Sequence, residues 1–323
     1  MGTEGTERIS REPLAPVLVA WSGSPRFAAA GFVYGMPALF VLLWATGFIG
    51  AKLGLPYAPP LQFLLWRFGV VIVLMTLLAW AARALWPRGV QLAHVAAAGV
   101  LLQAGYLGGV FTSINLGMPA GVSALIVGLQ PILTAAFAAT TTSSLRERVS
   151  ARQWAGFVLG FGGVALVVSN KLGNGSFGWL AFAAVALALV SITAGTLYQK
   201  RYCGAQDLRT QSVVQFIAAG LVLLPLSLLF ETRSVVWSGQ LVFALLWLVL
   251  VLSLGAITLL LLLIRRGAAT QVSSLMYLVP PVTALIAWWV FDETLTPLVF
   301  AGMVVSVAGV ALVVRVPIRP LAA

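Results

Sequence analysis

The stretch Gly117–Val168 reads GMPAGVSALIVGLQPILTAAFAATTTSSLRERVSARQWAGFVLGFGGVALVV. A related stretch, GAATQVSSLMYLVPPVTALIAWWVFDETLTPLVFAGMVVSVAGVALVV, follows at Gly267–Val314. The first parts of the two copies align at an offset of 150 residues and the second parts at 146. Glycine, proline and glutamate positions match in the same order, namely Gly117 with Gly267, Pro131 with Pro281, Glu147 with Glu293 and Gly163 with Gly309. The sequence therefore predicts an internal duplication.

The composition is that of an integral membrane protein. Of the 323 residues, 61% are hydrophobic and only 8% are charged, and a soluble chain of this length would need more charge on its surface. Apolar runs long enough to cross a hydrocarbon core of about 30 Å recur along nearly the whole chain. Cys203 and His94 are the single cysteine and histidine, so we expect no disulfide framework, metal site or cofactor.

Ten membrane-spanning helices are predicted, which makes the fold class an all-α polytopic membrane protein. Residues 1–35 are expected to form a flexible cytoplasmic segment, and 317–323 a short cytoplasmic tail. Between them lie two five-helix repeats, residues 36–170 and 171–316. The predicted spans are Met36–Gly54, Pro60–Ala82, Ala93–Leu116, Pro119–Thr141, Arg152–Ser169, Phe177–Gln199, Gln211–Phe230, Gln240–Ile264, Ala269–Val290 and Pro297–Val314.

The loop charges favour the same number of spans. With the N-terminus in the cytoplasm and ten crossings, the outer segments hold three basic residues, Lys52, Lys171 and Arg233, and Arg67 lies within a span. The cytoplasmic segments hold the other fifteen, which is the positive-inside bias of membrane proteins and explains the net charge of +11 without nucleic acid. Both termini are therefore predicted to be cytoplasmic.

The duplicated stretches lie five spans apart, which is an odd number. The two halves are therefore expected to have opposite orientations in the membrane, as inverted repeats around a central cavity. Inverted repeats of this kind are common in secondary transporters, which bind their substrate near the membrane midplane between the halves.

Polar and aromatic residues in the middle of the spans are the candidates for lining this cavity. Each one alone is also compatible with packing, because Ser and Thr hydroxyls often bond the carbonyl one turn back. Together they describe a mostly apolar pocket with few polar anchors. The candidates are Trp44, Thr46, Gln103, Tyr106, Asn115, Ser123, Gln130, Thr193, Thr196, Thr258, Ser274 and Tyr277.

Arg67 and the matched prolines each have two interpretations. The Arg67 guanidinium either attracts a substrate carboxylate or phosphate, or it bonds helix-end carbonyls or pairs with Glu293. Pro131 and Pro281 either form a hinge of a gate or are kinks in a packed bundle. Their matched positions in the two copies favour the hinge.

None of the eight acidic residues falls inside a predicted span. Proton-driven carriers commonly use a membrane-embedded carboxylate as a relay. Two alternatives remain, with the first favoured: downhill facilitated transport, or coupling through a group at a helix end, such as Glu293, Glu147 or His94.

Several motifs, taken in order, resemble the EamA type of the drug/metabolite transporter superfamily. They are LLWATGFIGAKLG (Leu42–Gly54), PPLQFLLWRFGV (Pro59–Val70), GVSALIVGLQPILTA (Gly121–Ala135), Glu147, GFGGVALVV (Gly160–Val168), QVSSLMYLVPPVTALIAWWVFDETLT (Gln271–Thr296) and AGVALVV (Ala308–Val314). The resemblance implies ten spans in two inverted halves, location in a bacterial inner membrane, and export of small metabolites, including amino acids, some of them aromatic.

Other functions are less favoured by the residues. A sugar-phosphate or nucleotide-sugar exchanger would need several buried basic residues, and small-drug efflux is a further alternative. An intramembrane hydrolase would need a Ser–His pair or paired aspartates at one depth, which the predicted spans do not provide. The expected partners are therefore a small-molecule substrate and the lipid bilayer, with no nucleic acid, for a protein that is a monomer or weak dimer and not an enzyme.

Overall fold

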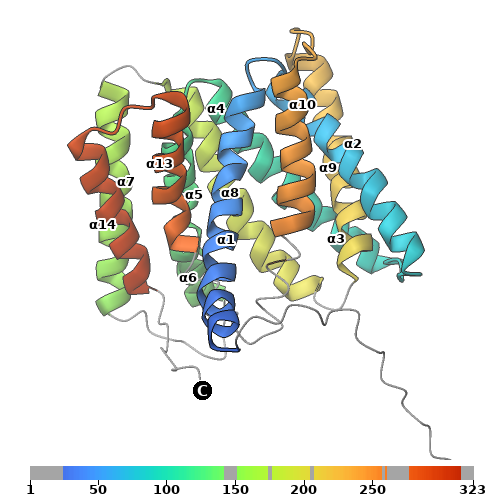
Figure 1. Ribbon diagram of the computed structural model, residues 1–323, viewed down its shortest axis with the longest axis horizontal. Coiled ribbons are helices and arrows are strands. Elements are labelled where there is room, and N and C mark those ends of the chain that lie inside the picture. The colour runs from blue at the N-terminus through green and yellow to red at the C-terminus, as the bar shows by residue number, and fades with distance from the viewer. Residues whose placement is uncertain are drawn as a thin grey trace, which may run out of the picture.

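A computed structural model describes residues 25–141, 151–173, 177–203, 207–256, 259 and 276–313. The regular elements in these ranges are all helical, and they stand side by side as a bundle (Figure 1). The helices of the first half are α1 Pro25–Gly54, α2 Pro60–Ala81, α3 Val90–Gly99, η1 Val100–Leu107, α4 Gly108–Asn115, α5 Ala120–Val127, α6 Gln130–Thr141 and α7 Ala151–Gly173. Those of the second half are α8 Trp179–Tyr202, α9 Leu208–Phe230, α10 Gly239–Leu246, η2 Trp247–Ala256, η3 Met276–Leu278, α13 Val279–Phe291 and α14 Pro297–Val313.

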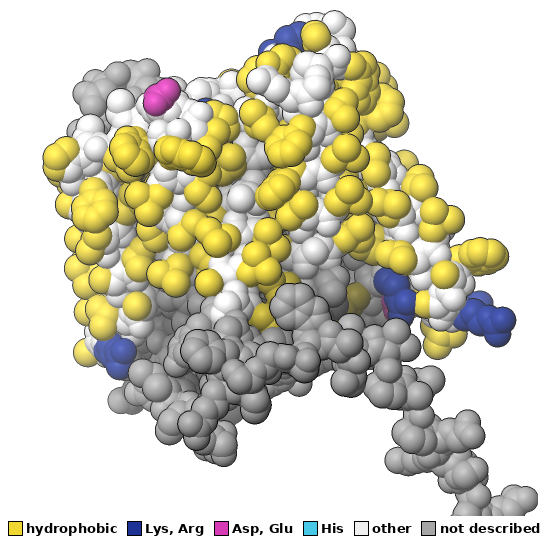
Figure 2. Space-filling view, viewed as in Figure 1, with side chains coloured by type: hydrophobic (Ala, Val, Ile, Leu, Met, Phe, Trp, Pro, Cys, Tyr) yellow, Lys and Arg dark blue, Asp and Glu magenta, His cyan; other side chains and the backbone are white. Residues whose placement is uncertain are grey.

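Five of the described helical segments are long and apolar enough to cross a membrane. They are Pro60–Ala81, Val90–Asn115, Trp179–Tyr202, Leu208–Phe230 and Gly239–Ala256. Shorter apolar segments lie at Ala38–Gly54, Ala120–Thr134, Trp154–Val168, Val279–Phe291 and Pro297–Leu312. The flank of the bundle is covered by hydrophobic side chains, while Lys and Arg appear at its two ends (Figure 2). This is the distribution expected of a protein surrounded by lipid.

The structure differs from the sequence prediction at the first helix and in two helix interiors. Helix α1 begins at Pro25 and not at Met36, so part of the predicted flexible segment is helical. Segments η1 and η2 are π-helical, where regular α-helix was expected. A π-helical turn bonds five residues back, is rare, and frequently occurs at functional sites.

Helix starts follow local sequence signals. Asp207 caps α9 by accepting a hydrogen bond from the Arg209 N–H, and Ser238 caps α10 by accepting one from the Leu241 N–H. Pro60 stands in the first turn of α2, where its missing N–H has no helical partner to lose.

Glu231 connects α9 with α2. Its carboxylate accepts the backbone N–H groups of Leu61 and Gln62, at 2.7 and 2.9 Å, in the first turn of α2. It also accepts the hydroxyl of Ser227, one turn back on α9. A carboxylate at a helix N-terminus satisfies open N–H groups and complements the helix dipole. Glu231 therefore fixes the end of α9 to the start of α2.

Helices α7 and α14 pack against each other with glycines at the contact (Figure 1). A Cβ added at Gly163 would lie 2.5 Å from the Gly302 carbonyl oxygen and 2.5 Å from the Ser306 nitrogen. A Cβ added at Gly309 would likewise meet the backbone of Gly160 and Gly156. Small residues let helix backbones approach closely in lipid, where van der Waals packing drives association.

This contact predicts a position-specific stability effect. The change Gly163→Ala forces backbone apart and should lower the free energy of unfolding by about 1–3 kcal/mol. Gly162→Ala is the matched control, because an added Cβ there has open space while the helix-propensity gain is the same. Thermal unfolding in detergent measures both variants, and equal stability would contradict the assigned contact.

Candidate functional site

The two ends of the bundle carry different polar contacts, and each is named here after one residue. The Lys52 end comprises residues 52–61, 117–120, 231–240 and 291–296. The His94 end comprises residues 82–94 and 198–210. Between the two ends, some of the candidate site residues lie in or next to irregular helix segments, namely Gln103, Tyr106, Gln130 and Tyr277.

In both copies of the repeated stretch, a short segment that is not α-helical directly precedes the matched prolines, and these segments, residues 128–129 and 276–278, are called the helix breaks. Helix α6 begins at Gln130, so Pro131 stands in its first turn, and the 3₁₀ segment η3 precedes Pro280 and Pro281 at the start of α13. The two breaks touch, because a Cβ added at Gly128 would lie 2.9 Å from the Pro280 Cγ. The prolines thus stand in the first turn of an α-helical segment, where a missing N–H costs no helical hydrogen bond.

Arg67 is the one charged side chain among the buried residues that the structure describes, with 5% of its surface exposed. Its Nη2 donates to the Ser253 hydroxyl in η2 at 3.2 Å. The Ser253 hydroxyl in turn donates to the Leu248 carbonyl oxygen, five residues back in the same π-helical segment. Tyr106 of η1 interacts electrostatically with Arg67. Arg67 is therefore bonded directly to the π-helical segment η2.

Thr46 and Trp44 belong to α1, which contacts η2. The Thr46 hydroxyl donates to the Leu43 carbonyl oxygen and accepts the Trp247 indole N–H at 2.9 Å. Trp44 is half-buried and packs against the Phe40 ring. Thr46 thus uses its hydroxyl to join two helices rather than leaving it free.

Gln130 contacts α8 through Thr196. The Gln130 amide nitrogen donates to the Thr196 hydroxyl at 3.1 Å, and that hydroxyl donates to the Ile192 carbonyl oxygen at 2.6 Å. Thr193 is fully buried and donates to the Leu189 carbonyl oxygen. These contacts place Gln130 and Thr196 together beside the break between α5 and α6.

The remaining candidates are dispersed. Ser123 is buried, and its hydroxyl lies 3.4 Å from the Ser113 hydroxyl. Gln103 is half-buried in η1, and Asn115, the last residue of α4, is exposed. Tyr277 lies in η3, and its side chain is outside the description. Thr258 and Ser274 lie outside the described residues.

Glu293 pairs with Lys52, and not with Arg67 as one interpretation of the sequence proposed. The Lys52 Nζ lies 2.5 Å from the Glu293 carboxylate and above the Phe291 ring. The same carboxylate oxygen accepts the Ala120 N–H at 2.9 Å, in the first turn of α5. One carboxylate thus joins α1, α5 and the connection between α13 and α14 at the Lys52 end.

Further contacts close the Lys52 end. The Arg233 guanidinium donates to the Leu55 carbonyl oxygen at 2.7 Å, and the Val236 N–H donates to the Tyr57 carbonyl oxygen. The Tyr57 hydroxyl bonds the side chain of Gln240. The connection between α9 and α10 therefore lies over the connection between α1 and α2.

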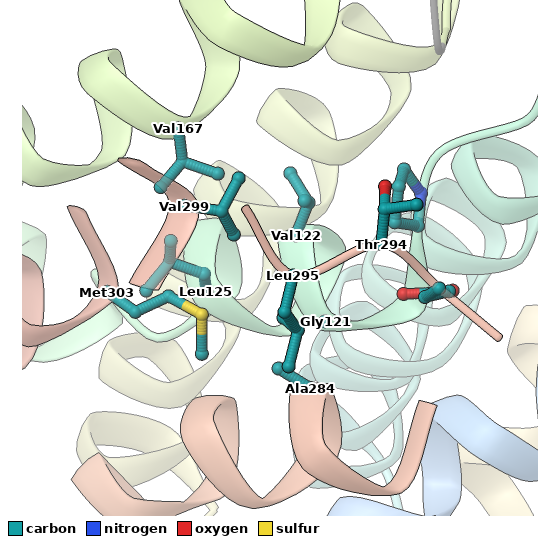
Figure 3. Close-up of a pocket in the computed structure, with 11 residues that line it drawn as sticks. Gly121, Val122, Leu125, Val167, Ala284, Thr294, Leu295, Val299 and Met303 are labelled. Carbon is teal, nitrogen blue, oxygen red and sulfur yellow. The ribbon is translucent and has the colours of Figure 1, made fainter. Parts of the chain in front are cut away.

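A small pocket lies directly beneath the Lys52–Glu293 pair, between α5, α13 and α14. Figure 3 shows Leu125 of α5 beside Val299 and Met303 of α14. Its volume of about 10 Å³ gives room for about one water molecule. This pocket is too small for a metabolite, so it is a packing gap beneath the closed end.

At the opposite end of the bundle, His94 contacts two tyrosines of α8. Its Nδ1 lies 2.8 Å from the Tyr198 hydroxyl, and its ring stacks on Tyr202 at 4.6 Å between centroids. Cys203 follows at the end of α8 and is buried, and this burial raises the pKa of its thiol. The thiol is therefore a poor nucleophile at neutral pH.

Two segments of the chain, residues 31–169 and 179–315, each match the EamA-like transporter family. The chain belongs to this family. The EamA-like protein is thus a membrane transporter, with one family match in each half of its sequence.

Relatives of this EamA-like protein carry transporter names. A protein of Escherichia coli K12 named "Probable amino-acid metabolite efflux pump" is 26% identical over 84% of this chain and 91% of its own length. The "Uncharacterized inner membrane transporter YedA" of the same strain is 26% identical over 85% of this chain and 89% of its own. A solved crystal structure of a protein shares the fold, with a TM-score of 0.59 at 18% identity over 88% of this chain and 96% of that one.

The Lys52–Glu293 pair should contribute more to stability than an exposed pair. Replacing either partner (Lys52→Met or Glu293→Gln) should cost about 1–3 kcal/mol, because the other partner is left poorly solvated, and the double variant should cost less than the sum. The more exposed Asp207–Arg209 pair is the control, for which Asp207→Asn with Arg209→Gln should show coupling below about 1 kcal/mol. Equal coupling in the two cycles, measured by thermal unfolding, would contradict this ranking.

Proposed function

We propose that this transporter is a secondary carrier that exports small metabolites, amino acids among them, by alternating access. The observation that carries the proposal is the pair of family matches, together with the name of the Escherichia coli relative. The described side chains agree with this class, because small-molecule sites are mostly apolar and hold a few polar groups. Arg67, Gln130 and Thr196 are such polar groups on largely apolar helices.

We further propose ten spans arranged as two inverted five-helix repeats, residues 36–170 and 171–316. Phe68 and Phe216 support this arrangement. They lie 148 residues apart, the same interval that separates the starts of the two family matches at residues 31 and 179, and their rings contact each other at 5.1 Å between centroids. A residue that touches its own repeat partner lies near the two-fold axis relating the two copies.

The glycine contacts between α7 and α14 give independent support. At the offset of 146, Gly156 corresponds to Gly302 and Gly163 to Gly309. The approach of Gly163 to Gly302 is matched by the approach of Gly309 to Gly156. A contact that recurs when both partners are exchanged for their equivalents is a property of two-fold symmetry.

Alternating access would use the helix breaks as hinges. Gly128 and Pro280 contact each other where the two copies of the repeat meet. Each break is followed by a helix with a proline in its first turn. The contacts of Glu293 and Arg233 join helices and connections at the Lys52 end. Opening that end would require the Lys52–Glu293 pair to separate.

The proposed orientation puts the Lys52 end outside the cell and both termini in the cytoplasm of a bacterium, with the protein in its inner membrane. The relative named as an inner membrane transporter supports this location. Downhill facilitated transport remains the favoured mechanism, because the predicted spans contain no carboxylate to relay protons.

The orientation predicts a labelling pattern. Val236→Cys at the Lys52 end should react with a membrane-impermeant maleimide in intact cells, whereas Leu85→Cys at the His94 end should react only after the membrane is opened. Both positions are exposed, at 58% and 85%. The native Cys203 should stay unlabelled in the folded protein, since it is buried and burial raises its pKa. The reverse pattern would contradict the orientation.

The transport proposal predicts flux in a purified system. Protein in liposomes should release labelled L-phenylalanine down its gradient, at a rate that is saturable and absent from empty liposomes. The rate should be the same with and without a pH gradient, because no proton relay is expected. Uphill accumulation driven by a proton gradient alone would contradict the facilitated mechanism, and flux of sugar phosphates without flux of amino acids would contradict the substrate class.

A further inference from the structure

The Arg67 guanidinium has more hydrogen-bond donors than the described structure satisfies. It carries five N–H donors, and one Nη2 bond goes to Ser253. Its Nε is buried and has no hydrogen-bond partner among the described residues. Leaving a buried charged donor without an acceptor costs roughly 1–3 kcal/mol or more. The arrangement around Arg67 is therefore incomplete in the absence of another acceptor.

The described acidic residues are all engaged elsewhere or stand at helix ends. Glu231 binds the start of α2, Glu293 binds Lys52, and Asp207 binds Arg209. Asp292 ends α13 with a left-handed backbone conformation. Arg67 lies about two helical turns from the start of α2, roughly 10 Å along the helix, so the counter-charge is absent from its surroundings in the described chain.

We propose that Arg67 binds the carboxylate of the transported solute, in a site completed by Ser253 of η2 and Tyr106 of η1. This inference rests on the proposed transport function and names the chemical group that the carrier recognises. A carboxylate can take the open Nε–H together with an Nη–H in a bidentate arrangement, which suits guanidinium geometry. Tyr106 of η1, which interacts electrostatically with Arg67, is the second polar side chain assigned to this site.

The charge of the site selects a monoanionic group. Arg67 brings one positive charge, and Lys52 is already paired with Glu293. A phosphate dianion would leave excess negative charge in a desolvated position, whereas one carboxylate balances one guanidinium. The site therefore favours amino acids and other monocarboxylates over phosphate esters and over amines without a carboxylate.

Contacts of its neighbours hold Arg67 in place. Phe68, its neighbour in sequence, packs against Phe216 of α9, and Glu231 fixes the start of α2. Ser253 is also fixed, since its hydroxyl proton is used by the Leu248 carbonyl. The Ser253 oxygen is therefore oriented as an acceptor for Arg67 before any solute arrives.

A comparison of three ligands on the wild-type protein tests the inference without a mutation. Binding to purified protein is measured by the thermal stabilisation that each of three probes produces: L-phenylalanine, 3-phenylpropionate and 2-phenylethylamine. We expect stabilisation by the two carboxylates and about tenfold weaker or absent stabilisation by the amine. Equal stabilisation by the amine, or no response to either carboxylate, would overturn the assignment.

Variants locate the site. Arg67→Gln should raise the Kd for both carboxylates at least about tenfold, Arg67→Lys should give an intermediate value, and Tyr106→Phe should raise it about fivefold. Arg88→Gln, in the exposed connection after α2, is the control for loss of one arginine and should bind as wild type. Unchanged carboxylate affinity in Arg67→Gln would overturn the proposal.

The two proposals fail separately. If Arg67→Gln does not fold, as judged by its ligand-free unfolding transition, Arg67→Lys and the wild-type probe series decide the question. If liposomes release no amino acid while both carboxylates still stabilise the protein in an Arg67-dependent manner, the transport proposal is wrong and the carboxylate site stands. If phenylalanine is transported but the amine stabilises the protein as much as the two carboxylates do, the site is wrong and the transport function stands.

Discussion

The structure depends on one constraint: in hydrocarbon, a backbone group that leaves the regular helix pattern has no water to bond. The irregular segments respond with groups from the protein itself. In η2, the Ser253 hydroxyl bonds the Leu248 carbonyl that the wider turn leaves accessible. At the starts of α6 and α13, prolines 131, 280 and 281 occupy positions where no N–H is required. The irregular backbone lies where helices of the two halves meet.

Packing differs between the two flanks of the bundle. On the α7–α14 flank, Gly163 and Gly309 allow backbones to touch, and there is no space for side chains between them. On the α2–α9 flank, Phe68 and Phe216 separate the helices, and Arg67 lies next to this pair. Close glycine packing suits a fixed contact between helices. The contrast places the carboxylate site away from the tightest helix pair.

Much of the fold could be predicted because apolar length and proline positions act locally. The range predicted for α2 ends one residue beyond the observed helix, and the family resemblance is confirmed. The π-helical segments could not be predicted, since their wider turns depend on packing against other helices. The depth of Arg67 was readable from the sequence, but its partner Ser253 is 186 residues away, and the choice of Lys52 as partner of Glu293 likewise depends on how distant spans meet.

The carboxylate of Glu231 has a mechanical consequence. It holds the end of α9 and two N–H groups of α2 at once, and Phe68 against Phe216 makes a second attachment further along the same helices. Two attachments at different heights restrain both sliding and pivoting of α2 against α9. Because Arg67 lies on α2 and its partner Ser253 lies in η2, a tilt of α2 relative to η2 would change the distance between them. A movement of these two helices, one from each half of the chain, would thus change the distance between Arg67 and a bound solute.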